Sequence, residues 1–165
     1  MGIIDELSAN SYKLIIAGPV GAGKTEAIRM LSDKGVVTTE EVASDKVKDM
    51  KKTTTVAMDY GVMKLDSGEQ VRIYGTPGQR RFDFMWEILS ENALGLVLLL
   101  NAEEADPVGD LHYYLDAFMP LIKSSALVVG VTHAENMPWD LHTRLSEALI
   151  SRGVAANVSV VDARE

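Results

Sequence analysis

One eight-residue stretch constrains this chain more than any other. It reads Gly18-Pro19-Val20-Gly21-Ala22-Gly23-Lys24-Thr25 and fits the phosphate-binding pattern G-x-x-x-x-G-K-[ST] at every fixed position. The apolar residues 12–17 before it predict a short buried strand, and residues 26–31 after it predict a helix. Strand, glycine loop and helix form the context that this pattern requires, so the stretch predicts a binding site for a nucleoside triphosphate.

The residue types of the loop indicate how such a site works. Glycines let backbone N–H groups turn toward phosphate oxygens, and the N-terminus of the following helix favours negative charge. We expect Lys24 to reach the β- and γ-phosphates and to assist catalysis, and the Thr25 hydroxyl to bind Mg²⁺. The nucleotide-binding residues expected here are Gly18, Val20, Gly21, Ala22, Gly23, Lys24, Thr25 and Glu26.

Composition excludes several other classes of protein. The chain has 165 residues, which fits one domain, and its net charge of -8 argues against nonspecific binding to nucleic acid. Cysteine is absent, and the three histidines are scattered, which argues against a zinc site. The longest apolar run, residues 93–100, is too short to span a membrane, and the N-terminus lacks a basic leader. We expect a cytoplasmic protein without an intrinsic membrane anchor.

Strand and helix patterns alternate along the chain. Strands are predicted over residues 12–17, 54–65, 70–74, 94–100, 126–131 and 158–161, and helices over residues 26–32, 82–92, 107–123 and 138–152, with Pro120 ending or kinking the third helix. Residues 36–52 predict either a short helix around 39–50 or a loop. This alternation predicts a single α/β domain over residues 1–165, a three-layer sandwich with a mostly parallel sheet. A hairpin turn at residues 66–69 places one antiparallel strand at an edge.

Two further motifs follow the glycine loop in a characteristic order. The first, Thr53-Thr54-Thr55-Val56-Ala57-Met58-Asp59-Tyr60, opens a predicted strand. The second, Gly75-Thr76-Pro77-Gly78-Gln79-Arg80-Arg81-Phe82, directly follows the strand after the hairpin turn. In this order the motifs resemble those of the Ras-like small GTPases, most of all the bacterial and archaeal single-domain type that includes the gliding-motility GTPase. The resemblance covers residues 12–164.

The resemblance implies a P-loop NTPase G domain that binds GTP or GDP with Mg²⁺ and hydrolyses GTP slowly as a molecular switch. It implies that Thr55 binds the metal, that the Gly78 N–H binds the γ-phosphate and that Gln79 orients the attacking water. It also implies a small roadblock-type regulatory partner and an effector that the sequence does not identify.

The chain departs from the family pattern at three places. Gly75 stands where the family has an aspartate, so the usual carboxylate near Mg²⁺ is missing. Thr132-His133-Ala134-Glu135 replaces the guanine-reading N-K-x-D, where Thr132 cannot reproduce the asparagine amide. Glu135 is either an acceptor for the guanine N–H groups or a solvated loop acid. Asp162-Ala163-Arg164 takes the place of S-A-K, where the Ala163 N–H would donate to guanine O6.

The source of positive charge for hydrolysis is open. The branched Val20 should crowd an arginine inserted by a partner, whereas Arg80 or Arg81, beside Gln79, could supply the charge from the same chain. Both arginines could equally be solvated or contact a partner.

The chain also stops at Glu165, where the family's final helix would begin, so we expect either a truncated chain or a partner that covers apolar sheet surface.

Other functions compete with the switch. A pseudo-GTPase that serves as a binding scaffold is favoured by Gly75 and Thr132 and opposed by Lys24, Thr25 and Gln79. An ATP-binding P-loop protein is a further alternative. A small-molecule kinase would need an arginine-rich lid, and the sequence contains no such stretch.

Overall fold

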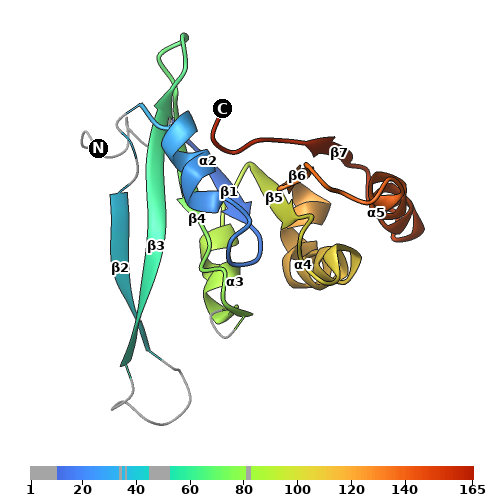
Figure 1. Ribbon diagram of the computed structural model, residues 1–165. Coiled ribbons are helices and arrows are strands. Elements are labelled where there is room, and N and C mark those ends of the chain that lie inside the picture. Colours follow the sequence, from blue (N-terminus) through green and yellow to red (C-terminus); the bar gives the residue numbers. More distant parts are fainter. Residues whose placement is uncertain (1–10, 34, 36, 45–52, 81–82) are drawn as a thin grey trace, which may run out of the picture.

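The computed structural model describes the chain except residues 1–10, 34, 36, 45–52, 81 and 82; for residues 37–44 and 53–57 it describes the backbone alone. The described strands form one sheet of order β2-β3-β4-β1-β5-β6-β7 (Figure 1). The strands are β1 Ser11–Ala17, β2 Val37–Ser44, β3 Thr53–Lys64, β4 Gln70–Gly75, β5 Gly95–Asn101, β6 Ala126–Thr132 and β7 Asn157–Val160. The helices are α2 Lys24–Leu31, α3 Phe84–Ser90, α4 Pro107–Ser124 and α5 Leu141–Ser151.

The predicted α/β architecture with a mostly parallel sheet is confirmed. β1 runs parallel to β4 and β5, and β6 runs parallel to β5 and β7. β3 is the antiparallel strand that the hairpin turn predicts, and it pairs with β4. It lies one position in from the edge, because β2 pairs with its other side and forms the edge itself.

The helix or loop expected around residues 39–50 is wrong for its described part. Residues 37–44 form β2, which pairs with β3 from Val37 opposite Tyr60 to Ser44 opposite Thr53. β-branched residues such as Thr38, Thr39 and Val42 fit a strand better than a helix, and the β3 backbone offers them ladder hydrogen bonds. α4 has nearly the predicted bounds, and Pro120 lies inside it and does not end it, since the helix continues to Ser124.

Apolar side chains on the two faces of the sheet form two cores. α2 covers one face over β3 and β4, where Ile28 packs with Ile16, Ile73 and Leu99. α3, α4 and α5 share the larger core with the other face. β5 is buried on both faces, with Leu98 in the larger core and Leu99 in the smaller one, which explains its uninterrupted apolar sequence.

An aromatic cluster joins α3 to α4. Trp86 is 1% exposed and stacks with Tyr114 and Phe118 at centroid distances of 5.1 and 5.2 Å. Its Nε1–H donates to the Pro77 carbonyl at 3.2 Å. The segment that follows β4 is therefore fixed to α4 through one buried indole.

We expect Trp86→Ala to lower the free energy of unfolding by about 3–5 kcal/mol, because it leaves a large cavity in this cluster. Urea denaturation followed by circular dichroism measures the change. Trp139→Ala is the matched control, since Trp139 is 92% exposed and its removal should cost less than about 0.5 kcal/mol. Equal losses in both variants would contradict the packing role of Trp86.

Apolar side chains also lie uncovered at one end of the sheet. Val128 in β6 is 47% exposed and Val160 in β7 is 56% exposed.

Among the described helices, none is both long and apolar enough to cross a membrane.

Candidate nucleotide-binding site

The glycine loop connects β1 to α2, as the sequence predicts (Figure 1). Gly18 has a φ of 151°, and a Cβ there would lie 2.1 Å from the Leu99 carbonyl oxygen, so no other residue fits. Gly23 is the N-cap of α2 and adopts a left-handed conformation with a φ of 96°. These two glycines turn the chain sharply into the N-terminus of α2, where the helix dipole favours an anion.

Lys24 lies at the start of α2 and folds back over the loop. Its Nζ donates to the carbonyl oxygens of Gly18 at 2.7 Å and Pro19 at 2.8 Å. Burial lowers the pKa of Lys24 to about 8, and the nearby Asp59 charge opposes this effect. The lysine is therefore a partly desolvated cation inside the loop, ready to exchange two carbonyl oxygens for phosphate oxygens.

Gly78 closes the other side of the loop. A Cβ at this position would lie 2.8 Å from Lys24 Nζ and 2.9 Å from the Val20 nitrogen, so only glycine allows this approach. Between the loop and this segment lies a cavity of about 440 Å³. Val20, Lys24, Thr25 and Gly78 line it together, which brings four of the sequence-predicted residues to one place.

Asp59 is a candidate site residue that the sequence analysis missed. The Thr25 Oγ1 hydroxyl donates to Asp59 Oδ2, and Asp59 lines the same cavity. In the register of the hairpin, Asp59 of β3 lies directly opposite Gly75 of β4. The family's aspartate is absent at Gly75, as the sequence shows, and β3 supplies a carboxylate beside Thr25 instead.

The signal that could have found Asp59 is the hairpin turn. It pairs Lys64 with Gln70, and counting outward from that pair places Asp59 opposite Gly75. Thr55, the other expected metal ligand, lies farther along β3 opposite Val42. Its side chain lies outside the described residues, so its metal role stays a prediction.

A second cavity of about 410 Å³ lies beyond Gly23, on the other side of the loop. It is lined by Gly23, Glu26, Val160, Val161 and the two predicted base-reading segments, 132–135 and 162–164. The structure therefore brings Thr132, His133, Glu135, Asp162, Ala163 and Arg164 together around one pocket, as the sequence predicts.

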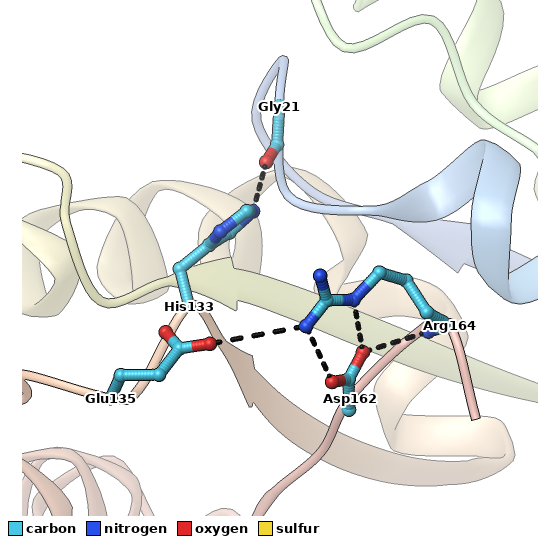
Figure 2. A network of polar contacts seen from close by, with 5 residues as sticks. All are labelled: Gly21, His133, Glu135, Asp162 and Arg164. Atoms are coloured by element: carbon cyan, nitrogen blue, oxygen red, sulfur yellow. Dashed lines mark hydrogen bonds and ion pairs between the residues drawn. The ribbon is translucent and has the colours of Figure 1, made fainter.

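An ionic network crosses the rim of this pocket (Figure 2). Arg164 Nη2 lies 2.8 Å from Asp162 Oδ2, and Nε and the backbone N–H both donate to Oδ1 at 2.9 Å. These hydrogen bonds from Arg164 lower the pKa of the Asp162 carboxyl and keep it ionised. Glu135 also lines this pocket, and its Oε1 lies 4.0 Å from Arg164 Nη2, at the edge of ion-pair distance.

Two residues of the 132–135 segment tie it to the glycine loop. The buried Thr132 hydroxyl lies 2.8 Å from the Ala22 carbonyl oxygen, to which it donates. His133 has a φ of 53°, and its Nε2 lies 3.1 Å from the Gly21 carbonyl oxygen (Figure 2). The Thr132 hydroxyl therefore donates to the backbone of the glycine loop. Thr132 and His133, which line the second cavity, thus connect that cavity directly to the glycine loop.

The segment after Gly78 carries the other expected catalytic residues. The cavity of about 440 Å³ beside the glycine loop is here named the phosphate cavity, and Gly78 lines it. Gln79, the next residue, is exposed and does not line it. Arg80 Nη2 donates to Asp110 of α4 at 3.0 Å, and Arg80 is not among the residues that line this cavity. Arg81 lies outside the described residues.

This fold, with a phosphate loop at the carboxyl end of β1, defines a P-loop nucleotide-binding protein. The chain belongs to the family described as "Conserved hypothetical ATP binding protein", whose model matches residues 34–134. The matched region begins after the phosphate loop and contains Asp59, Gly78 and the first base-reading segment up to Ala134.

Comparison with solved structures supports the fold. The chain is similar to the G domain of the FeoB iron transporter of T. maritima, with a TM-score of 0.57 and 16% identity over 91% of this chain and 87% of that one. It is also 29% identical over 125 residues to an uncharacterized protein of Methanocaldococcus jannaschii, which covers 76% of this chain and 70% of the relative. The fold is therefore that of a P-loop G domain, and kinship with the gliding-motility type stays a prediction.

Proposed function

We propose that this protein is a Mg²⁺-dependent GTP-binding switch that hydrolyses GTP slowly. The observation that carries the proposal is the contact between Thr25 and Asp59 beside the partly desolvated Lys24. The Thr25 hydroxyl at the start of α2 and the Asp59 carboxylate of β3 are oxygen ligands of the kind that Mg²⁺ prefers next to nucleotide phosphates. When bound, the ion would neutralise charge on the β- and γ-phosphates.

The residues in and beside the phosphate cavity have distinct parts in this proposal. Lys24 would bind the β- and γ-phosphates, while Thr25 and Asp59 would hold the metal, directly or through water. The backbone N–H of Gly78 would contact the γ-phosphate, and Gln79 would orient the attacking water. Thr55 would join the metal site in the triphosphate state alone, which would make β3 responsive to the nucleotide.

Guanine recognition is supported by the acidic and basic groups around the second cavity. Glu135 would accept from guanine N1–H and N2–H, and the Ala163 N–H would donate to guanine O6. The Arg164 guanidinium, held by Asp162, adds positive potential on the side where O6 would lie. Adenine carries an acceptor at N1 and a donor at its exocyclic amine, so it would meet both groups with the wrong polarity.

The resemblance to single-domain Ras-like GTPases adds partners to the proposal. It suggests a small roadblock-type regulator, a separate effector and a cytoplasmic location, by analogy with that family.

An ATP-binding protein is the second candidate, and it is favoured by two observations. The family description names ATP, and Thr132 uses its hydroxyl on the Ala22 carbonyl rather than on a base. In that case Glu135 would be a solvated loop acid, and the base pocket would not discriminate guanine from adenine.

Glu135→Ala separates the two candidates. We expect it to weaken binding of a non-hydrolysable GTP analogue by about 10- to 100-fold, because a good bidentate base contact is worth on the order of 1–3 kcal/mol. Affinity for the matching ATP analogue should not change. Titration calorimetry in Mg²⁺ measures both affinities, and Glu147→Ala on the exposed side of α5 is the control.

Wild-type protein that binds the ATP analogue as tightly as the GTP analogue would refute guanine recognition. Single-turnover phosphate release from GTP tests hydrolysis separately. Tight binding without any release would leave the binding scaffold as the better description.

A further inference from the structure

The segment 77–80 between β4 and α3 is held at both of its ends. At its start, the Pro77 carbonyl accepts the Nε1–H of the buried Trp86 at 3.2 Å. At its end, Arg80 Nη2 donates to Asp110 Oδ1 of α4 at 3.0 Å. Gly78 and Gln79 lie between these two anchors, and Gly78 packs directly against Lys24 and Val20.

Arg80 is part of a closed ring of contacts rather than a single surface pair. Its guanidinium carbon lies 3.8 Å from the centroid of the Tyr113 ring. The Tyr113 hydroxyl donates to Asp83 Oδ2 at 3.3 Å, and the Asp83 backbone N–H donates to the Arg80 carbonyl at 3.0 Å. The segment before α3 is thus joined to α4 by an ion pair, a cation–π contact and one hydrogen bond, and the backbone hydrogen bond from Asp83 to Arg80 closes the ring.

The carboxylate of this ion pair is more buried than its cation. The Asp110 side chain is 18% exposed, whereas that of Arg80 is 55% exposed. Burial raises the pKa of the Asp110 carboxyl, and the Arg80 charge opposes that rise. An ionised carboxylate in such a place depends on its cation, so opening the ring would leave the Asp110 charge partly buried without that partner.

We propose that the ring of Arg80, Asp83, Asp110 and Tyr113, here named the Arg80 clamp, positions Gln79 for hydrolysis and that Arg80 is not an arginine finger. The proposal rests on the proposed function, because it assigns a means of positioning to the same site. The clamp and Trp86 fix the two residues that flank Gly78-Gln79, which sets the path of the loop over the phosphate cavity. Arg80 acts through the loop backbone, with its charge committed to α4.

Asp110→Asn distinguishes a clamp from a parked finger, by which we mean an arginine finger that Asp110 holds away from the phosphates. The substitution breaks the ion pair and leaves Arg80 in place. A clamp predicts that single-turnover GTP hydrolysis slows by roughly 10- to 100-fold, since small displacements of a catalytic group have effects of that size. A parked finger predicts the opposite, faster hydrolysis by the released arginine. In either case GTP affinity should change less than about threefold, because neither residue lines the phosphate cavity.

Three further variants complete the test. Arg80→Gln should slow hydrolysis as Asp110→Asn does, and the double variant should be no slower than the slower single one, because both changes open the same ring. Arg80→Lys keeps the charge opposite Asp110 and should recover part of the rate. Arg144→Gln is the matched control, since Arg144 forms an ion pair with Asp140 at 3.2 Å on α5.

A second readout needs no nucleotide. In a Trp139→Phe background Trp86 is the sole tryptophan, and its fluorescence reports how well the loop is seated on α4. We expect Asp110→Asn and Arg80→Gln to increase quenching of Trp86 by acrylamide, and Arg144→Gln to leave it unchanged.

Faster hydrolysis in Asp110→Asn, or unchanged rate and quenching in both clamp variants, would overturn the proposal. Wild-type protein that binds no GTP would instead refute the proposed function and catalytic positioning with it. Increased Trp86 quenching would then still identify the clamp as the anchor of this loop.

Discussion

Lys24→Ala should abolish tight binding of nucleoside triphosphates. Lys24 is the cation inside the glycine loop, and its two hydrogen bonds to loop carbonyls mark the place where phosphate oxygens would be bound. Charge-assisted hydrogen bonds contribute about 1.5–3 kcal/mol each, so losing two should weaken affinity by roughly two to four orders of magnitude. Titration calorimetry with a non-hydrolysable GTP analogue measures the loss.

Lys123→Ala, in the exposed last turn of α4, is the control and should bind as the wild type does. A folded Lys24→Ala protein with unchanged affinity would remove the basis for the whole assignment of the loop.

The lowered pKa of Lys24 gives the same interaction a pH signature. With a pKa of about 8 in the free protein, Lys24 is mostly charged below that pH and increasingly neutral above it. Phosphate binds the charged form, so complex formation at alkaline pH must take up a proton, and affinity should fall as pH rises from about 8 to about 9.5. Calorimetry in two buffers with different ionisation enthalpies would detect this proton uptake directly.

Asp59→Asn should remove most of the Mg²⁺ dependence of nucleotide binding. The substitution preserves the shape of the side chain and its capacity to accept from Thr25, but it removes the charge that a divalent cation needs. We expect the ratio of GTP-analogue affinities with Mg²⁺ and with a chelator to fall by roughly tenfold or more, in line with the loss of one charged contact.

Asp66→Asn in the exposed hairpin turn is the matched control, because it removes the same charge far from Thr25 along β3. If Asp59→Asn retained the full Mg²⁺ dependence, the carboxylate would serve only as a hydrogen-bond acceptor for Thr25.

Local sequence determines the parts of the fold that were predicted correctly. The glycine loop, β1 and α2 follow from residue types that permit one backbone path, such as Gly18 against the Leu99 carbonyl. The uninterrupted apolar run in β5 predicts a central strand because both of its faces are buried. The two base-reading segments could be placed together because each follows a parallel strand, β6 or β7, at the same edge of the sheet.

The features that sequence could not supply depend on contacts between distant segments. β2 is a strand because β3 offers it a partner, whereas its own residues also fit a capped helix. Asp59 reads locally as one more residue of a strand, and its relation to Thr25 exists through packing alone. The Arg80 clamp likewise joins residues of a loop to residues of α4. The sequence pattern of neither segment indicates that the two are in contact.

Because Asp59 lies opposite Gly75, the length of a remote turn determines whether Asp59 can reach the candidate metal site. Residues 66–69 set which residue of β3 faces which residue of β4, and side chains alternate between the two faces along a strand. If one residue inserted in that turn shifted the register by one, the Asp59 side chain would turn toward the opposite face of the sheet. The candidate metal site would then lose its carboxylate, although none of its own residues had been substituted. A gap or insertion at 66–69 in a related chain would therefore bear on the candidate metal site, although an alignment would record it as variation in a surface loop.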